Sequence, residues 1–458
     1  IEFDLDLGNT EALCDRGINI HRLTRFFLLR LRRPVLCGPH VVQTVRQFYQ
    51  NNADILCHRK EHLSQVFCLL LDLIRRIFQL CQLRDTAYNQ GHLRVGVVGC
   101  GAISDIYLTN MIHNFENLEV AACCAGHLEH AKKKAEQYGI KGCTYEEILA
   151  DPSIEMVVIL TPAPTHEGLI RQALEAGKHV YTEKTMTLAP ETAAKLIELA
   201  EEKHLYLGSA PDTFLGSALQ TARKAIDDGL IGEVTSFEAC ANRDLDLLAS
   251  IFRFLRMPGG GICYDFGVYY LTAIVSLFGP VDRVVSSVRN LAPKRVNVVP
   301  DSPEYGQEFD YSNESQAFTI LEMKNGVTGT FCVNGDSTIN DQAVFTIYGK
   351  KGILKLVDPN NFGGDIVYIP GVKDWTQQAV PEVLDYGFAY SENSRGLGPS
   401  EMAEAIAEGR LNRANAKMAY HVLDVIDQIM KSAKSGAFEK VPSTCERPAA
   451  LPVPEKEQ

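Results

Sequence analysis

The chain is short of positive charge. Its 458 residues include 45 Lys and Arg against 57 Asp and Glu, which leaves a net charge of −12. Binding along a nucleic-acid backbone needs clustered Lys and Arg, so this balance argues against a nucleic-acid-binding protein. Residues 1–90 differ, because they carry 12 Lys and Arg and 9 Asp and Glu. We therefore expect the N-terminal segment to be a separate part of the protein.

A long uncharged apolar run is also missing. The most apolar stretch, residues 66–83, contains Asp72, Arg75 and Arg76, whereas a membrane-spanning helix needs about 20 mostly uncharged residues. The acidic start IEFDLDLGNTE does not resemble a signal peptide. The 13 cysteines form no Cys-x-x-Cys pair, which favours a reducing compartment in which they serve as small core residues. We expect a cytoplasmic protein with no membrane span and no metal site.

Residues 1–90 are predicted to be a helical extension. Between residues 63 and 78, apolar side chains recur at i, i+3, i+4 and i+7, which makes one apolar stripe along a helix. A small bundle, a docking arm or a basic helix lying on a membrane surface would each fit this stripe. Packing on another helix or on a partner subunit is the favoured interpretation.

From Gly91 onward, short β-rich runs alternate with helical stretches. Strands that alternate with helices of this length predict a parallel sheet with right-handed crossovers. Residues 91–212 are therefore expected to form a doubly wound α/β domain of the Rossmann type. The expected strands are LRVGVVG, LEVAACCAG, MVVILTP, HVYTEK and LYLGSA.

Beyond residue 212 the texture becomes mainly β. A helix, SALQTARKAIDDG, and the glycine segment GGGICYDFGVYY precede several alternating runs joined by Asn-Gly and Lys-Gly turns, which predict a large, mostly antiparallel sheet. Residues 213–440 are expected to form an α+β domain for substrate binding and oligomerisation, closed by a helix near AYHVLDVIDQIMKSAKSG. The Pro-rich residues 441–458 are expected to be a loosely held tail.

A glycine turn joins the first expected strand to the first expected helix. Two glycines in such a turn allow close backbone approach to a pyrophosphate, which the N-terminus of the helix then attracts. A small residue, Ser104, takes the position of the third glycine of the usual fingerprint. The predicted cofactor-binding residues of this turn are Gly99, Cys100, Gly101, Ala102 and Ile103.

The second expected strand lacks the acid that usually holds the adenosine ribose. It ends in Cys124, followed by Ala125, Gly126 and His127, where an Asp or Glu favours NAD. Ala125 is a further predicted cofactor contact. The absence of an acid leaves room for a 2′-phosphate, and His130 and the lysines at 132–134 could supply positive charge to it. The cofactor is predicted to be NAD or NADP, with NADP slightly favoured.

Unusual residues follow two further expected strands. Thr161, Pro162 and His166 follow MVVIL, and Glu183 with Lys184 directly follows HVYT. In open α/β sheets ligands bind at the carboxyl ends of the strands, so the Lys184 ammonium is expected beside the nicotinamide. A surface lysine that opens a loop is the alternative.

The stretch VVILTPAPTHEGLIRQALEAGKHVYTEKTMTL resembles the signature of the Gfo/Idh/MocA oxidoreductases, the glucose–fructose oxidoreductase and inositol dehydrogenase family. It has a T-P-x-x-x-H turn, an A-x-x-A-G-K-H-V strand entry and an E-K-x-x-x-L turn. GGGICYDFGVYYLTAIVSLFG and DDGLIGEV match the second domain of the family. The resemblance covers about residues 92–440 and leaves residues 1–90 outside.

The resemblance implies roles for individual residues. Lys184 would touch the nicotinamide ribose and the substrate hydroxyl, while Glu183 and His166 would shape the nicotinamide pocket. Asp265 and Tyr269 correspond to the acid and the acid/base position of the family's D-x-G-x-[HY] helix. 

The sequence departs from the family at three positions. Thr185 replaces a Pro, Thr272 replaces an acid, and Tyr269 stands where many sugar dehydrogenases have His. The Tyr version resembles glucose–fructose oxidoreductase and the dimeric dihydrodiol dehydrogenases. 

The chemistry of these residue types agrees with the implied roles. Tyr, with a pKa near 10, is a poor base unless a cation stabilises its phenolate. Lys184 is placed to supply that cation, and Asp265, one helical turn before Tyr269, would orient Lys184 or a sugar hydroxyl. The alternative for Tyr269 is a buried aromatic with a satisfied hydroxyl. Further candidates for substrate contact are Arg243, Tyr270 and Asp212.

The predicted activity is hydride transfer between NAD or NADP and a secondary hydroxyl or carbonyl of a sugar, polyol or glycoside, with a keto-glycoside as one product. A dihydrodiol dehydrogenase or another carbonyl reductase is the second enzyme hypothesis. A cofactor-binding regulator with residues 1–90 as a partner-binding module is the third, and the joint presence of Lys184, Asp265 and Tyr269 favours an enzyme. The family also implies a homodimer or higher homo-oligomer formed through the open face of the second-domain sheet.

Overall fold

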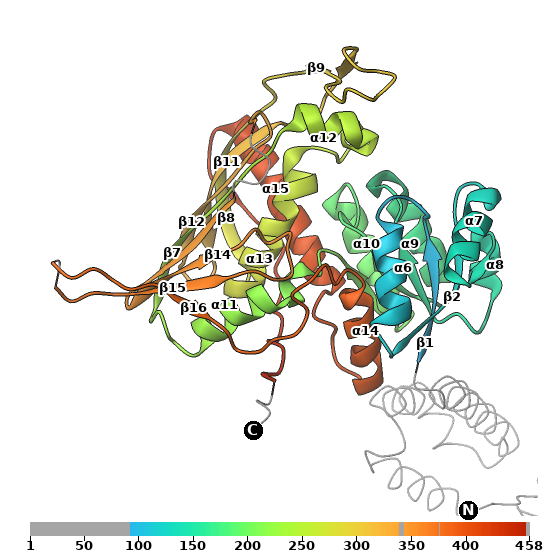
Figure 1. Ribbon diagram of the computed structural model, residues 1–458, viewed down its shortest axis with the longest axis horizontal. Coiled ribbons are helices and arrows are strands. Elements are labelled where there is room, and N and C mark those ends of the chain that lie inside the picture. The colour runs from blue at the N-terminus through green and yellow to red at the C-terminus, as the bar shows by residue number, and fades with distance from the viewer. Residues whose placement is uncertain (1–91, 339–342, 375, 455–458) are drawn as a thin grey trace, which may run out of the picture. The chain divides into compact units, whose positions relative to one another are not determined.

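The computed structural model describes residues 92–338, 343–374 and 376–454 (Figure 1). The predictions made for residues 1–90 lie outside these ranges. Gly91–Gln458 forms one compact unit, in which the described residues build two large sheets.

The first sheet is parallel, in the order β3-β2-β1-β4-β5-β6. This confirms the predicted doubly wound fold. The two-residue β3 was not predicted, because so short a strand carries no periodic signal. The strands are β1 (Leu93–Val98), β2 (Leu118–Cys124), β3 (Lys141–Gly142), β4 (Met156–Ile159), β5 (His179–Thr182) and β6 (Leu207–Ser209).

Helices cover both faces of this sheet (Figure 1). Val95 and Val97 pack in one apolar core with Tyr107 of α6, whereas Val98 packs in a second core with Ile170 of α9. Burial on both faces explains why these strands read as continuous apolar runs. The helices are α6 (Ser104–His113), α7 (Leu128–Tyr138), α8 (Tyr145–Ala150), α9 (His166–Glu175) and α10 (Pro190–Glu202), with a 3₁₀ turn η2 (Ala163–Thr165).

The second sheet has nine strands in the order β16-β15-β14-β13-β7-β12-β11-β8-β17. Only β7 and β12 pair in parallel within it, so the predicted mostly antiparallel sheet is confirmed. The strands are β7 (Val234–Asn242), β8 (Val281–Arg289), β11 (Gln316–Met323), β12 (Thr328–Asn334), β13 (Ala343–Gly349), β14 (Gly352–Leu356), β15 (Ile366–Pro370), β16 (Glu382–Leu384) and β17 (Glu439–Lys440). A separate ribbon pairs β9 (Lys294–Val296) with β10 (Glu308–Asp310).

Helices α11, α13 and α15 lie along the nine-stranded sheet (Figure 1). The glycine segment leads into η5 (Cys263–Gly267), a π-helical turn that continues directly as α13. Helices α12 and α14 were not predicted. The remaining elements are η3 (Thr213–Leu215), α11 (Ser217–Asp227), α12 (Leu245–Ile251), η4 (Arg253–Arg256), α13 (Val268–Phe278), α14 (Leu397–Glu408) and α15 (Ala416–Ser435).

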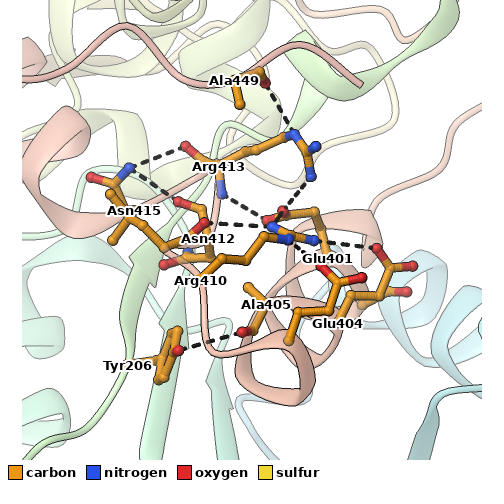
Figure 2. A network of polar contacts seen from close by, with 12 residues as sticks. Tyr206, Glu401, Glu404, Ala405, Arg410, Asn412, Arg413, Asn415 and Ala449 are labelled. Atoms are coloured by element: carbon orange, nitrogen blue, oxygen red, sulfur yellow. Dashed lines mark hydrogen bonds and ion pairs between the residues drawn. The ribbon is translucent and has the colours of Figure 1, made fainter. Parts of the chain in front are cut away.

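The C-terminal segment is held by hydrogen bonds from the buried Arg223 and the half-buried Arg413, so the prediction of a loose tail is wrong for residues 441–451. Figure 2 shows Arg413, whose Nε donates to the Ala449 carbonyl at 3.0 Å and whose Nη1 pairs with Glu401 at 2.8 Å. Arg223 Nη1 donates to the Pro448 carbonyl at 3.0 Å. Proline carbonyls remain acceptors although proline nitrogen cannot donate, so a Pro-rich composition does not prevent such anchoring.

Two further findings concern the described residues only. None of their helices combines the length and apolar character that a membrane crossing needs, and no cluster of three or more His, Cys, Asp or Glu among them could hold a metal ion. The predicted domain boundary near residue 212 stays a prediction, since both sheets belong to one compact unit.

Candidate active site

The glycine turn lies where the strand order of the parallel sheet reverses, between β1 and β4. Gly99 has φ +106°, and an added Cβ would lie 2.9 Å from the Leu160 carbonyl carbon, so this position needs glycine. At Gly101 an added Cβ would meet nothing within 4 Å. Gly101 therefore borders open space in front of the α6 N-terminus, which fits a dinucleotide pyrophosphate.

The rest of the turn is anchored to the protein. Ser104 is buried and its Oγ donates to the Gly101 carbonyl at 2.6 Å. Cys100 Sγ donates to the Cys124 carbonyl at 3.4 Å, which ties the turn to the end of β2. Ala102 is exposed and Ile103 is half-buried.

Two of the lysines near the end of β2 form ion pairs within the protein. Lys132 pairs with Glu129 at 2.9 Å, and Lys134 pairs with Asp105 at 2.5 Å. The absence of an acid after β2 is therefore the remaining argument for NADP, and these lysines add little to it.

Lys184 lies in a turn that begins where β5 ends. Its Nζ donates to the Asp265 carbonyl at 3.0 Å and forms an ion pair with the Asp265 carboxylate. Glu183 accepts from Tyr107 Oη at 2.7 Å and from the backbone N–H of Lys184 at 3.0 Å. The structure thus brings Lys184 and Asp265 together, as the sequence predicted, and the surface-lysine alternative does not apply.

His166 joins the Thr161 turn to the Lys184 turn. Its Nδ1 lies 2.8 Å from the Thr185 carbonyl and its Nε2 lies 2.7 Å from the Thr161 carbonyl. Burial lowers the pKa of His166. A neutral imidazole has one N–H and donates to one of these carbonyls. Pro162 precedes η2, and the Lys184–Thr185 peptide bond is cis.

Asp265 lies in the π-helical turn η5, and Tyr269 lies in the first turn of α13. The expectation of a single α-helical turn across both residues is therefore corrected. Single π-helical turns are rare in proteins as a whole, and those that occur often lie at functional sites. Tyr269 is 7% exposed, and Lys184 Nζ lies 5.3 Å from the centroid of its ring.

The charges of the cluster shift its pKa values. Burial disfavours the Lys184 ammonium, but Asp265 and Tyr269 outweigh burial and raise the pKa of Lys184 above its usual value. Burial also raises the pKa of Tyr269, against the lowering effect of Lys184 and Arg395. Lys184 is therefore a permanent cation beside the tyrosine.

Arg395 is a site residue that the sequence analysis missed. Its Nη2 donates to Tyr269 Oη at 3.4 Å and to Asn360 Oδ1 at 2.8 Å. Arg395 lies in the irregular segment before α14, 126 residues from Tyr269 in the chain. Such a segment has no periodic pattern, and no local signal in the sequence points to this arginine.

Arg243 meets a protein carboxylate where a substrate was predicted, and Tyr270 is enclosed by the protein. Arg243 forms a buried ion pair with Asp358 and is 4% exposed, and Tyr270 is fully buried. The Asp358 carboxylate accepts from the backbone N–H of Asn360 at 3.0 Å. Asn360 in turn accepts from Arg395, so Arg243 is connected to Arg395 through Asp358 and Asn360. Direct substrate contact by Arg243 or Tyr270 stays a prediction.

Asp212 is also buried and accepts from the Gly398 N–H at 2.8 Å. Burial raises the pKa of Asp212 to about 6. Its contact with α14 gives it a structural partner, and substrate contact stays a prediction here too.

Comparison with known proteins supports the reading of both sheets. The model described as "Oxidoreductase family, NAD-binding Rossmann fold" matches residues 93–210, and the model of the GFO/IDH/MocA C-terminal domain matches residues 219–355. An uncharacterized oxidoreductase of Rhizobium meliloti is 32% identical over 363 residues, which are 76% of this chain and 99% of the relative.

Two other proteins that resemble this chain have named activities. A trans-1,2-dihydrobenzene-1,2-diol dehydrogenase of Bos taurus is 26% identical over 271 residues, 58% of this chain and 75% of that protein. The solved structure of levoglucosan dehydrogenase in complex with NADH and L-sorbose has a TM-score of 0.66 at 19% identity, and the match covers 77% of this chain and 99% of that one. The latter likeness shows the fold.

The fold and the glycine turn thus define an NAD(P)-dependent oxidoreductase. The chain belongs to the Gfo/Idh/MocA family of oxidoreductases.

Proposed function

We propose that the protein transfers a hydride between NAD(P) and a secondary hydroxyl or carbonyl of a sugar, polyol or glycoside. The observation that carries this proposal is the contact of Lys184 with both Asp265 and the ring of Tyr269, at the carboxyl end of β5. The parallel strands bring this edge to the same side of the sheet as the Gly99 turn.

The residues of the cluster would handle the proton of the substrate hydroxyl. When bound, NAD(P) would supply the acceptor for the hydride that leaves the substrate carbon in the oxidising direction. Tyr269 takes the hydroxyl proton, and the adjacent cations Lys184 and Arg395 stabilise its phenolate against the cost of burial. Asp265 holds Lys184 in place through the ion pair. In the reducing direction Tyr269 returns the proton.

A polyhydroxylated substrate suits this site better than an apolar diol. Lys184, Tyr269, Arg395 and Asn360 offer several hydrogen-bonding groups within one connected set of contacts. A dihydrodiol, the substrate in the name of the Bos taurus relative, has two hydroxyls and would use fewer of these groups than a polyhydroxylated ring. A ring hydroxyl of a glycoside, oxidised to a keto-glycoside, is the specific substrate that we propose.

The cofactor assignment follows from the end of β2. NADP is slightly favoured over NAD, because no carboxylate follows Cys124 to accept from the ribose hydroxyls. Gly99 to Ile103, Ala125, Thr161 and Glu183 are the proposed contacts, with His166 orienting the nicotinamide pocket.

The location and the assembly of the protein are proposed on separate grounds. All cysteines among the described residues are free thiols, which suits the cytoplasm. The open face of the nine-stranded sheet exposes Phe318, Ile320 and Val344, and we assign it to a homodimer or higher homo-oligomer. 

The test of the proposed reaction is the substitution Lys184→Ala. Turnover on a panel of glycosides, polyols and a trans-dihydrodiol should fall at least about 10²-fold, as expected on losing acid–base help. The dissociation constants of NADH and NADPH, measured by fluorescence titration, should change little. Lys195→Ala, on the exposed side of α10, is the matched control and should behave as wild type. 

Each arm of this panel decides between hypotheses. Turnover of the dihydrodiol alone would favour the second enzyme hypothesis. Nucleotide binding with no turnover of any compound by wild type would contradict the proposed reaction and favour a cofactor-binding regulator.

A further inference from the structure

The loop before β11 braces the glycine segment that leads into η5. Tyr311 Oη donates to the Gly260 carbonyl at 3.1 Å. Asn313 Nδ2 donates to the carbonyls of Leu255 and Met257 at 3.0 and 2.8 Å. Two side chains of one loop therefore satisfy three carbonyls of an irregular segment, which fixes the path of that segment.

Glu314, the next residue of this loop, caps the first turn of η5. Its carboxylate accepts from the Cys263 N–H at 3.0 Å. Its own carbonyl accepts from the Ile262 N–H at 3.2 Å. The first N–H groups of a helix lack partners within the helix, and a carboxylate is also stabilised there by the helix dipole.

The Glu314 carboxylate occupies the space that a side chain at position 261 would need. A Cβ on Gly261 would lie 2.0 Å from each carboxylate oxygen of Glu314. Gly261 does not have the positive φ of Gly259, so space rather than backbone conformation demands the glycine. An alanine at 261 would have to displace the Glu314 carboxylate, which is the movable end of a flexible side chain.

The capped turn carries the acid of the candidate active site. The Asp265 N–H donates to the Gly261 carbonyl at 2.8 Å, and the Asp265 carbonyl and carboxylate both accept from Lys184. Displacement of the first turn of η5 would therefore move Asp265 and, through it, the Lys184 ammonium. The backbone of η5 is thus the link between Glu314 and Lys184.

We infer that Glu314 is a positioning residue: its carboxylate, seated over Gly261, sets the place of Asp265 and Lys184 for proton transfer. The inference rests on the proposed function, because it assigns Glu314 a part in that reaction. Burial raises the pKa of the Glu314 carboxyl to about 7.

The experiment compares Glu314→Gln, Gly261→Ala and the double variant with wild type, on the best substrate of the panel. Each single variant should lower kcat by about tenfold or more, because small displacements of reacting groups are costly in rate. KM and the nucleotide dissociation constant should stay within about twofold, since Glu314 is not among the proposed contacts of either ligand. The double variant should be no slower than the slower single variant, because both changes remove one contact.

Glu322→Gln is the matched control, since Glu322 lies on β11 and pairs with the exposed Arg283; it should retain wild-type kcat. A wild-type kcat for Glu314→Gln, with Lys184→Ala inactive, would overturn this inference and leave the proposed function intact. So would additive losses in the double variant, or a parallel loss of nucleotide binding, which would indicate a purely structural cap. An inactive wild type on the whole panel would overturn both proposals.

Discussion

Tyr269 is the proposed base, and its surroundings act on its pKa in opposite directions. Burial raises its pKa, while Lys184 beside the ring and Arg395 at the hydroxyl act to lower it. A histidine would ionise near neutral pH without such help. The tyrosine therefore explains why the site keeps two cations, one from the β5 turn and one from the loop before α14.

Replacing Tyr269 by Phe tests this assignment. The ring and its contact with Lys184 remain, but the acid/base hydroxyl is lost, so kcat should fall about 10²–10⁴-fold. Nucleotide affinity should be unchanged in a fluorescence titration. Tyr368→Phe, in β15, serves as the control. A near-normal kcat for Tyr269→Phe would contradict the assignment of the proton transfer to Tyr269.

At the scale of elements, close neighbours leave no room for a side chain at any of the three glycines of the glycine segment. Gly259 has φ +82°, and a Cβ there would lie 2.4 Å from a methyl of Leu188 in the Lys184 turn. A Cβ on Gly260 would lie 2.3 Å from the Leu255 carbonyl oxygen, and one on Gly261 would meet Glu314. The segment is thus a close-packed junction.

A second junction joins α15 to β8 and to the C-terminal segment through His421. Its Nε2 accepts from the Val281 N–H at 2.9 Å, and its Nδ1 lies 2.8 Å from Ser443 Oγ. Burial lowers the pKa of His421 to about 4, from a usual value of 6.5, against the opposing effect of Asp424. The neutral ring is therefore the form that the fold needs.

This shift predicts a pH dependence of stability. The unfolded chain binds a proton at His421 below pH 6.5, whereas the folded protein does so only near pH 4. The contribution of neutral His421 to the stability of the fold is therefore complete above pH 6.5 and is lost as the pH falls toward about 4. Between about pH 7.5 and about pH 5, wild type should lose about 2 kcal/mol more unfolding free energy than His421→Gln. Urea denaturation at both pH values measures this difference. Equal losses in the two proteins would contradict the prediction.

At the scale of the whole molecule, the nine-stranded sheet has one face packed on helices and one face without such cover among the described residues. On the open face, the strand registers align Phe318 with Cys332, Cys332 with Cys240, and Cys240 with Val344. Phe318 is 49% exposed and Val344 is 41% exposed. A row of apolar side chains across four adjacent strands favours burial against a second copy.

Phe318→Glu tests the proposed assembly. A charge in the middle of an apolar interface costs several kcal/mol without a partner, so the variant should shift toward the monomer mass in light scattering at micromolar concentration. Val380→Glu, at a loop position that is 77% exposed, should keep the wild-type mass. A monomeric wild type, or a Phe318→Glu protein of unchanged mass, would contradict the proposal.

The sequence alone determined those features of the protein that depend on local residue patterns. The strand–helix alternation, the Gly99 turn and the Glu183-Lys184 turn depend on residues close together in the chain, where periodicity and turn sterics act directly. From these, the parallel sheet, its nucleotide turn and the pairing of Lys184 with Asp265 were predictable, the last through a family resemblance.

Tertiary structure alone decided what surrounds these groups. Arg395 meets Tyr269 across 126 residues of chain, and the Glu314 carboxylate meets Cys263 across 51. Both come from irregular segments whose paths are set by packing against distant elements, so no spacing in the sequence encodes them. The same packing turned Arg243 toward Asp358, because a buried charge must find a partner.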